Sequence, residues 1–446
     1  MTIHNNFALF SAAILASTLF FAACSDDSSS APEEKSSHEE ETSHEEHHGH
    51  HMEEPSEGDL TLGNEDIQDG FIFLQDTTIN GVLTVSTTTP GATVLKNVKV
   101  TGNLLIKRSG RVDFSGSADV VHVGSSNTDV YAFEDEAQVN GHHFMGKNNT
   151  FTTKSFAEYQ NVDWTEKSVD LATGIHLAYT VTGDEKGTPV VLIHGLTDGR
   201  VSWSQVAPSL AKKGYRVYVP EYRGNGKTDK PIDESSYSVA ELASDIAAFV
   251  EKLGLKKVHI VGHSLGAFIA QELSITNAEI VSSITLIGSG ASVDKKNATL
   301  DWLVNGTDDE SFDGIYAYDS TQKLPESFIQ AWGYSTNPDK DFQAANLEHL
   351  KQVPYYVWKY LVKNLLKIDN TKRLSSIATD VQIIWGTKDA LFDSASQKTL
   401  QKGLSKAKSV VFHEVEGADH NTHWGSAEDV KTVTGYIDEF IKSLKK

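Results

Sequence analysis

The segment VHIVGHSLGAFIAQEL, Val258 to Leu273, places a serine between two glycines. An apolar β-branched run precedes Gly262, and a run typical of a helix follows Gly266. Glycines at these positions permit a tight turn and a close approach of strand and helix, which a β-carbon would obstruct. The pattern predicts that Ser264 is a nucleophile on a strand-to-helix turn. The alternative is a serine without chemical role in a glycine-rich corner.

Apolar runs and helix-like runs alternate from about Val162 to the C-terminus. Runs rich in Val, Ile and Leu are typical of buried, mainly parallel strands, and their alternation with helices predicts an open α/β sheet. Ligands of such sheets bind at the carboxyl ends of the strands. The expected strands lie in the segments IHLAYTVTG, PVVLIHG, RVYVPEYRG, KVHIVGHS, VSSITLIGSG, DVQIIWGTKD and SVVFHEVEG.

The serine segment resembles the nucleophile elbow of the α/β-hydrolase fold, and the resemblance extends over roughly 162–446. The segment VVLIHGLTDGRVSW is similar to the His-Gly loop of that family. The resemblance implies that the backbone N–H groups of Leu196 and Leu265 form an oxyanion hole. It gives His194 a structural hydrogen-bonding role rather than that of a general base. The segment EYRGNGKTDKP resembles the family's Asp-x-Arg-Gly-x-Gly-x-Ser stretch, with Glu221 and Thr228 replacing Asp and Ser.

In this family the chain order is nucleophile, acid, histidine. The resemblance implies Asp389 as the acid, in VQIIWGTKDALF, and His420 as the base, in the Gly-x-x-His loop of VVFHEVEGADHNTHW. A serine hydroxyl needs an imidazole, oriented by a carboxylate, to be a useful nucleophile at neutral pH. Two alternatives stay open: Asp393, whose other interpretation is a helix N-cap, and His423. His413 falls within the expected last strand.

An insertion from about Ala291 to Ile377 separates the sixth and seventh expected strands. By the same resemblance it is a helical cap over the active site. It is denser in aromatic residues than the whole chain, whose aromatic content is 9%. We expect these side chains to form the core of the cap and its contact with the main domain. Some of them are suited to line an apolar acyl or aryl pocket.

The segment 60–155 is rich in Val, Thr, Gly and Asn, in short alternating runs such as TINGVLTV and ATVLKNVKVTGNLLIK. Period-two alternation broken by Gly or Asn predicts strands and turns without helices. Glycines recur at intervals of about twenty residues, at Gly81, Gly102, Gly124 and Gly141, which suggests stacked rungs. The segment resembles a short parallel β-solenoid, and a β-sandwich is the alternative. We interpret it as a spacer or binding module.

Residues Phe7 to Ala23 form an uncharged, mostly apolar run, which predicts an export signal over 1–23. The run ends at Cys24 in FFAACS, which resembles the lipobox of bacterial lipoproteins. That resemblance implies lipidation of Cys24 and a membrane anchor in the cell envelope, with the protein facing the periplasm or the exterior. Phe21 replaces the usual Leu, and no Lys or Arg precedes the run. A retained membrane helix is the alternative. A single cysteine excludes an intramolecular disulfide.

Residues 24–59 are highly charged and lack periodic apolar residues, which predicts a disordered tether. The stretch 26–59 holds thirteen Asp and Glu against one Lys, so it carries over half of the net charge of −22. The remainder is mildly acidic, which argues against nucleic acid as a partner. The tether histidines are able to bind Zn²⁺ or Ni²⁺ weakly, although a solvated spacer is the simpler interpretation. They are His38, His44, His47, His48, His50 and His51.

Together these features predict an exported serine hydrolase that cleaves small-molecule carboxylic esters through an acyl-enzyme intermediate. No metal or organic cofactor is expected. Haloalkane dehalogenase and epoxide hydrolase activities are disfavoured, because relatives with those activities place Asp at the elbow, where this chain has Ser264. Amidase, lipase, carbon–carbon bond hydrolase and perhydrolase remain alternatives. The alternative from another class is an extracellular binding or adhesion lipoprotein with a non-catalytic hydrolase domain.

Overall fold

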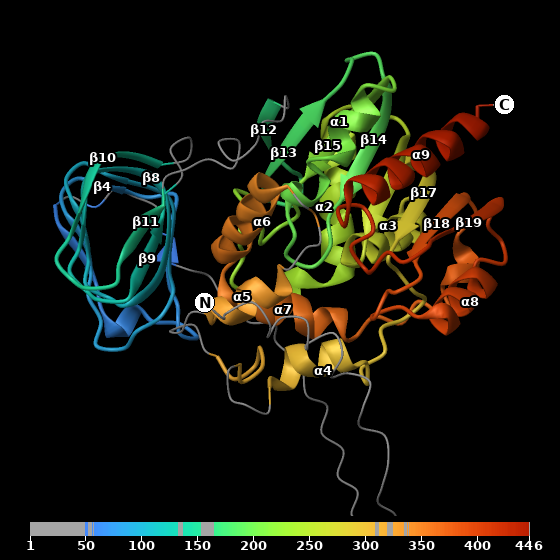
Figure 1. Cartoon of the computed structure of the whole chain (residues 1–446). Helices are drawn as coiled ribbons and strands as arrows, with labels where there is room; N and C mark the ends of the chain where they lie inside the picture. The colour runs from blue at the N-terminus through green and yellow to red at the C-terminus, as the bar shows by residue number, and fades with distance from the viewer. Residues whose placement is uncertain are drawn as a thin grey trace, which may run out of the picture. The chain divides into compact units, whose positions relative to one another are not determined.

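The computed structural model describes residues 50–51, 56, 58–132, 137–152, 165–307, 312–318, 324–333, 337 and 339–445. These residues belong to one compact unit, Gly49–Lys446. Two regions with different backbone patterns follow one another along the chain (Figure 1). The first, up to Thr152, is built from strands, and the second, from Thr165 onward, alternates strands and helices.

The first region is a set of short strands, and every pairing among those that the structure describes is parallel. They are β1 (His50–His51), β2 (Leu60–Leu62), β3 (Ile72–Gln75), β4 (Thr78–Ile79), β5 (Leu83–Val85), β6 (Thr93–Val100), β7 (Leu104–Ile106), β8 (Gly110–Val123), β9 (Thr128–Tyr131), β10 (Ala137–Phe144) and β11 (Thr150–Thr152). A 3₁₀ helix, η2 (Asn64–Asp66), follows β2.

Paired strands of this region are offset by about twenty residues in the sequence, as in β2 with β5 and β5 with β7. Leu83 lies opposite Leu104, which in turn lies opposite Val121, and all three side chains are fully buried. Hydrogen bonds between exposed side chains connect residues at a similar offset. The side-chain amide of Asn97, for example, donates to Asp76 at 2.9 Å, across 21 residues. The stacked apolar side chains of the interior and the hydrogen-bonded polar side chains of the turns therefore recur with about the same period in the sequence.

The recurring glycines follow this repeat only in part. Gly102 donates its N–H to the Gly81 carbonyl at 2.9 Å, so these two stack as expected. Gly141, however, lies in β10 opposite Val120, and Gly124 follows the end of β8. The offset between paired strands is not constant along the region, so equal sequence spacing does not bring all four glycines into one column.

The second region contains an eight-stranded sheet in the order β12-β13-β15-β14-β16-β17-β18-β19. Its strands are β12 (Thr165–Asp170), β13 (His176–Thr182), β14 (Thr188–Ile193), β15 (Tyr215–Pro220), β16 (Val258–His263), β17 (Val281–Ile287), β18 (Asp380–Gly386) and β19 (Ser409–Val415). The pairs β12–β13 and β13–β15 are antiparallel, and the others are parallel. The α/β fold class is thus observed in this region. The sequence pattern does not reveal β12, because TEKSVD is an edge strand without an apolar run.

Helices cover both faces of this sheet (Figure 1). They are α1 (Val206–Ala211), α2 (Val239–Lys252), α3 (Leu265–Thr276), α8 (Ser394–Gly403) and α9 (Ala427–Ser443), with the 3₁₀ helices η4 (Arg200–Trp203), η5 (Glu234–Tyr237), η6 (Ala278–Ile280) and η7 (Leu374–Ser376). Alternate residues of β14 enter different cores: Val190 and Leu192 pack with α1 and α9, whereas Val191 and Ile193 pack with α2 and α3. Burial on both faces explains why this strand is apolar throughout.

Four α-helices lie between β17 and β18 in the described part of the chain, where the sequence predicts an inserted cap: α4 (Ala298–Asn305), α5 (Glu326–Trp332), α6 (Lys340–Gln352) and α7 (Tyr355–Leu365). Their aromatic side chains contact one another. Phe328 stacks on Phe312 at 4.2 Å between ring centroids and meets Trp358 edge-on at 5.3 Å. Phe312, Phe328 and Trp358 are buried, so aromatic residues of the insertion form its own core.

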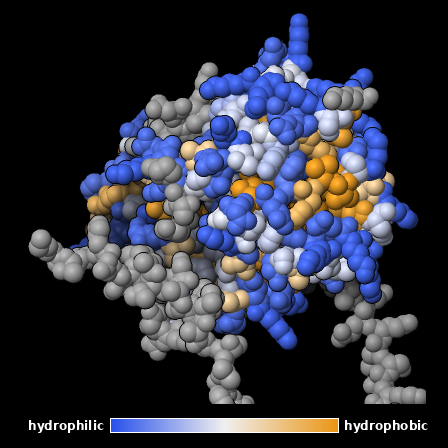
Figure 2. Space-filling model, turned by 45° about the vertical axis from the view of Figure 1, so that its right-hand side comes forward, coloured by the Kyte–Doolittle hydropathy of each residue, from blue (hydrophilic) through white to orange (hydrophobic). Residues whose placement is uncertain are grey.

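Hydrophilic residues cover much of the face shown in Figure 2, and the largest group of hydrophobic residues lies on the right-hand side of the view, with smaller groups elsewhere. Among the described residues, Met145 and Val410 are the large hydrophobic side chains that are exposed. No helix in the described part of the chain has both the length and the hydropathy needed to cross a bilayer. The segment 1–23 and Cys24 lie outside the described residues.

Candidate active site

Ser264 lies on the turn between β16 and α3, at the carboxyl end of a central strand. Its backbone has a φ of 50°, in the left-handed region that non-glycine residues seldom adopt. A β-carbon on Gly262 would lie 2.2 Å from the Gly266 carbonyl oxygen, and one on Gly266 would lie 2.3 Å from that of Ile193. Both glycines are therefore needed for the strand, the turn and the helix to pack this closely.

Asp389 and His420 form a hydrogen-bonded pair. Nδ1 of His420 lies 3.1 Å and 3.0 Å from the two carboxylate oxygens of Asp389. Asp389 is buried in the loop after β18, where its Oδ1 also accepts the N–H groups of Leu391 at 2.8 Å and Phe392 at 3.0 Å. Because the carboxylate occupies the Nδ1 side of the ring, Nε2 is the nitrogen of His420 left for proton transfer.

Charge interactions within this pair outweigh the effect of burial. Burial alone would lower the pKa of His420, but the Asp389 carboxylate and, to a smaller extent, Asp198 raise it above its ordinary value. Burial alone would raise the pKa of Asp389, but His420 and the two backbone N–H donors lower it. The arrangement thus favours an ionised carboxylate beside an imidazole that is more basic than usual.

Two contacts hold the serine turn next to the loop that carries His420. One is made by the end of β17, and the other is made by His263, the residue before Ser264. Ser264 donates its N–H to the Ile287 carbonyl at 2.9 Å. The next residue, Gly288, has a φ of 53°, and a β-carbon there would lie 3.1 Å from Nδ1 of His420. From the other side, Nε2 of His263 lies 3.1 Å from the His420 carbonyl oxygen. The serine turn and the histidine loop are therefore neighbours although they are far apart in sequence.

The His-Gly loop lies against the serine. A β-carbon on Gly195 would be 3.2 Å from Cβ of Ser264, a tight contact, so the loop approaches the serine closely at this glycine. In the described part of the chain the N–H groups of Leu196 and Leu265 donate no hydrogen bond, and that of Leu265 belongs to the first turn of α3. Thr197 follows with a φ of 61°, a conformation that is strained for a β-branched residue. Strain at such a loop is a feature of functional sites.

Asp393 and His423, which the sequence left as alternatives, and His413, which it placed in the last strand, lie in other environments. Asp393 caps α8, its Oδ1 accepting the N–H of Ser396 at 2.8 Å. His423 is fully buried, neither ring nitrogen has a hydrogen-bond partner among the described residues, and burial lowers its pKa well below the ordinary value. His413 lies in β19 and stacks on Tyr436 at 3.9 Å. Asp389 therefore pairs with His420 and with neither of the other two histidines.

A buried ionic network that sequence reasoning missed supports the His-Gly loop. Arg200 is fully buried; its Nε lies 3.1 Å from Glu221 and its Nη1 lies 3.0 Å from Glu166. The ring of His349, in cap helix α6, lies so close to Gly199 that a β-carbon there would be 2.1 Å from it. The sequence offered one sign of this network, which is Glu221 in EYRGNGKTDKP, where the family usually has Asp. Its longer side chain reaches Arg200, a partner that cannot be identified without the fold.

His263 and Asp198 form a second acid–histidine contact that was missed. Nδ1 of buried His263 lies 3.4 Å from Oδ2 of Asp198, while its Nε2 faces the His420 carbonyl. Burial lowers the pKa of His263, and Asp198 opposes that effect. His263 thus contacts the backbone of the His420 loop rather than the serine, and its position directly before Ser264 gave no sign of this contact.

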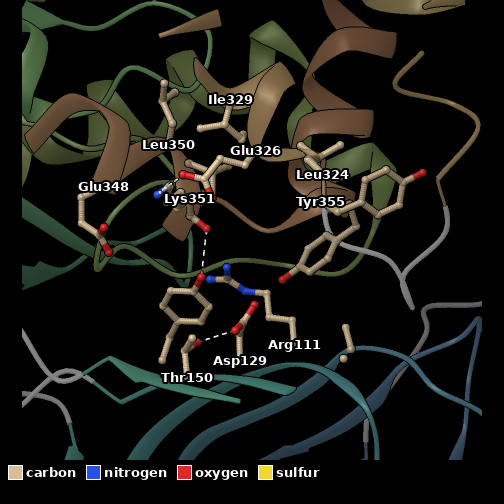
Figure 3. A pocket seen from close by; sticks show the side chains of 15 residues that line it. Arg111, Asp129, Thr150, Leu324, Glu326, Ile329, Glu348, Leu350, Lys351 and Tyr355 are labelled. Atoms are coloured by element: carbon tan, nitrogen blue, oxygen red, sulfur yellow. Dashed lines mark hydrogen bonds and ion pairs between the residues drawn. The ribbon is translucent and has the colours of Figure 1, made fainter. Parts of the chain in front are cut away.

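The cavity shown in Figure 3 has a volume of about 350 Å³ and lies away from these residues. Arg111, Asp129, Glu326 and Tyr355 are among its lining residues, and none of the predicted site residues is. Among the described residues no group of three or more His, Cys, Asp or Glu side chains is placed to hold a metal ion. The tether histidines His38, His44, His47 and His48 lie outside the described residues.

A family model described as "alpha/beta hydrolase fold" matches residues 188–427, more than half of the chain. The chain belongs to the α/β-hydrolase family. This assignment confirms the fold resemblance found at the serine turn.

Several relatives share this domain. Epoxide hydrolase 1 of Caenorhabditis elegans is 26% identical over 322 residues, which cover 68% of this chain and 77% of that protein. A 2-hydroxy-6-oxononadienedioate/2-hydroxy-6-oxononatrienedioate hydrolase of Pseudomonas putida is 28% identical over 292 residues, covering 61% and 93%. Among solved structures, an esterase from Exiguobacterium antarcticum superposes with a TM-score of 0.52 at 19% identity, covering 63% of this chain and 99% of the esterase. That likeness shows the fold alone.

Proposed function

We propose that the protein is a serine hydrolase that cleaves carboxylic esters through an acyl-enzyme intermediate. The observation that carries the proposal is the Asp389–His420 pair beside a serine on a strained strand-to-helix turn. The order Ser264, Asp389, His420 along the chain supports it, as do the N–H groups of Leu265 at the serine turn and of Leu196 on the His-Gly loop. Serine at the elbow favours acyl transfer over epoxide opening, although one relative is named an epoxide hydrolase.

The proposed reaction uses only groups of the chain and water. Nε2 of His420 takes the proton of Ser264 while Oγ forms a bond to the ester carbonyl carbon. The N–H groups of Leu196 and Leu265 stabilise the oxyanion that results. The bond to the leaving alcohol then breaks, and His420 returns its proton to the alkoxide. Water attacks the acyl-enzyme by the same route, which releases the acid and restores Ser264.

The electrostatics of the pair suit this scheme. The ionised Asp389 orients His420 with Nδ1–H toward the carboxylate and stabilises the imidazolium that forms in each step. The raised pKa of His420 makes it a stronger base, and it must be deprotonated in the resting enzyme to act. Activity is therefore proposed to rise with pH through the pKa of His420.

The test is turnover of p-nitrophenyl esters of increasing acyl length by the full chain and by its Ser264→Ala variant. We expect saturable hydrolysis by the parent, a burst of p-nitrophenol equal to the enzyme concentration where deacylation is slow, and neither in the variant. Equal turnover by both proteins would remove the proposal.

A carbon–carbon bond hydrolase is the second candidate, because the Pseudomonas putida relative is 28% identical over most of its length. The same serine, acid and histidine are compatible with that reaction. Parallel kcat/KM measurements on p-nitrophenyl acetate and on 2-hydroxy-6-oxononadienedioate separate the two. A ratio that favours the dienedioate by more than about a hundredfold, a difference of some 3 kcal/mol in transition-state binding, would select the second candidate.

For the remainder of the chain we propose a short parallel β-solenoid acting as a spacer or binding module, joined by the acidic tether to a lipidated Cys24 in the cell envelope. The parallel pairing of the first region and the hydrogen-bonded polar side chains of its turns support the solenoid. Lipidation is tested by phase partitioning: a Cys24→Ser variant should leave the detergent phase, and partitioning equal to that of the parent would favour a retained helix at 7–23.

A further inference from the structure

The peptide unit between Gly195 and Leu196 is held by an unusual number of donors. The Gly195 carbonyl accepts the hydroxyl of Tyr222 at 2.6 Å, Nδ1–H of His194 at 2.9 Å and, more weakly, the N–H of Asp198 at 3.5 Å. The C=O and N–H of one trans peptide point to opposite sides. Fixing the Gly195 carbonyl on one side therefore fixes the direction of the Leu196 N–H on the other.

We propose that Tyr222 and His194 are positioning residues that clamp the Gly195 carbonyl and so aim the Leu196 N–H at the oxyanion formed at Ser264. This inference rests on the proposed acyl-enzyme function. It assigns to Tyr222 an indirect role in the reaction, exerted through the peptide between Gly195 and Leu196. The benefit is preorganisation: a donor already in place needs no rearrangement when negative charge develops.

The side chains of His194 and Tyr222 also contact each other. The rings of His194 and Tyr222 stack at 4.0 Å with 20° between their planes, and both are fully buried. Burial lowers the pKa of His194 to about 4, so the imidazole is neutral at ordinary pH. Its Nε2 has no hydrogen-bond partner among the described residues, which leaves the bond from Nδ1 as the ring's polar contact. The imidazole is thereby a donor to the loop and not a base.

The loop requires such a clamp because its backbone has little else to hold this peptide. Gly195 has no side chain, and a β-carbon there would lie 2.4 Å from Asp198 and 2.8 Å from His263. Thr197, two residues on, is in the left-handed region. Rotation of the 195–196 peptide would turn its carbonyl dipole toward the serine, where it would oppose the oxyanion. Three donors on the opposite side disfavour that rotated state.

The test removes one oxygen atom. A Tyr222→Phe variant keeps the ring and its stacking but loses the donor to Gly195. We expect kcat on a p-nitrophenyl ester to fall about five- to tenfold with KM changed less than twofold, because the oxyanion exists only in the transition state. The inhibition constant of a tetrahedral boronate should rise by the same factor as kcat falls.

Tyr237→Phe is the matched control. Tyr237 is also buried and donates its hydroxyl at 2.7 Å to the carbonyl of Pro231, which belongs neither to the serine turn nor to the His-Gly loop. It should lose similar stability to urea and keep kcat within twofold of the parent. A merely structural role for Tyr222 would make the two variants alike in kcat and in boronate binding, and that outcome overturns the clamp.

Failure of the clamp is distinguishable from failure of the proposed function. If a fluorophosphonate labels Ser264 and Tyr222→Phe still has parental kcat and boronate affinity, the clamp alone is wrong. If Ser264 is not labelled and Ser264→Ala retains turnover, the acyl-enzyme route is wrong and the clamp falls with it. A rise in KM with unchanged kcat in Tyr222→Phe would assign the tyrosine to substrate binding instead and also overturns the inference.

Discussion

The two described regions handle left-handed backbone in different ways. In the strand-only region the non-glycine residues with positive φ are Asp69, Asp76, Asn97, Asn127 and Asn148, whose short polar side chains tolerate that conformation. In the hydrolase region they are Thr197 and Ser264, which do not favour it. The first set makes turns at little cost, whereas the second stores strain at the loop and turn where we place the reaction. The type of residue in the left-handed region thus differs between turns that only shape the backbone, which use Asp and Asn, and the proposed active site, which uses Thr197 and Ser264.

The hydrogen bonds at these positions differ in the same way. Asn97 bonds to Asp76, and Asn148 bonds to Asn127 at 3.1 Å, each across 21 residues, so each turn is supported by its equivalent in the next strand layer. Ser264 has no such equivalent. Its turn is held by β17 through the Ile287 carbonyl and by two glycines that admit the neighbouring backbone. A repeat supports itself locally, whereas the elbow depends on several distant segments.

The largest expected effect breaks the hydrolase side of this comparison. Replacing Ser264 or His420 with alanine should lower kcat/KM by about 10⁵-fold or more, and the double variant should lose little further, because the two groups act as one unit. Steady-state kinetics on a p-nitrophenyl ester measure all three.

His423→Phe is the control for this series, because His423 is buried, has no hydrogen-bond partner among the described residues and should be nearly dispensable for catalysis. Severe loss at His423 with full activity in His420→Ala would move the base three residues along the chain. Losses that multiply in the double variant would deny that Ser264 and His420 cooperate.

Glycine substitutions should have opposite outcomes in the two regions. Gly266→Ala places a β-carbon 2.3 Å from the Ile193 carbonyl oxygen and should destabilise the fold by about 2–3 kcal/mol. Gly141→Ala meets nothing within 4 Å and should leave stability within about 0.5 kcal/mol of the parent. Urea unfolding of both variants is the measurement. Tolerance of Gly266→Ala would mean that strand and helix do not approach this closely.

Much of the hydrolase region could be predicted from the sequence, because its strands are apolar on both faces and Ser264 sits in a motif whose glycines have a steric reason. Asp389 and His420 followed from the chain order of the family. Edge strand β12, Asp198, Tyr222 and Arg200 could not be predicted in the same way. Their roles depend on contacts between segments distant in sequence, such as the bond from Tyr222 to Gly195, and no local pattern records such a contact.

A pH profile sharpens the account of His420. Its pKa is raised in the fold, and activity should rise with pH as the proton leaves, with a midpoint above the ordinary value of about 6.5. Asp198→Asn removes a negative charge that raises this pKa and should shift the acid limb of kcat/KM to lower pH. Profiles of the parent and the variant at constant ionic strength decide the point. A shift in the opposite direction would show that Asp198 does not act on His420 through its charge.

The smallest expected effect compares strain directly. Ser264→Gly should have a free energy of unfolding about 1 kcal/mol higher than that of Ser264→Ala, because glycine adopts the left-handed conformation without penalty. Urea unfolding of the two variants measures this difference. Asn97→Gly should gain nothing over the parent, since asparagine already tolerates this conformation and its bond to Asp76 is lost. Equal stability of the two Ser264 variants would contradict stored strain at the elbow.

The most direct test of the central claim is covalent labelling of the full chain with a fluorophosphonate, followed by mass mapping of the adduct. The probe reacts with an activated serine, so the account predicts one adduct on the peptide that carries Ser264, formed at least a hundredfold more slowly in His420→Ala and at the parental rate in His423→Phe. An unlabelled Ser264 in the folded parent, or labelling that is indifferent to His420, would contradict the account.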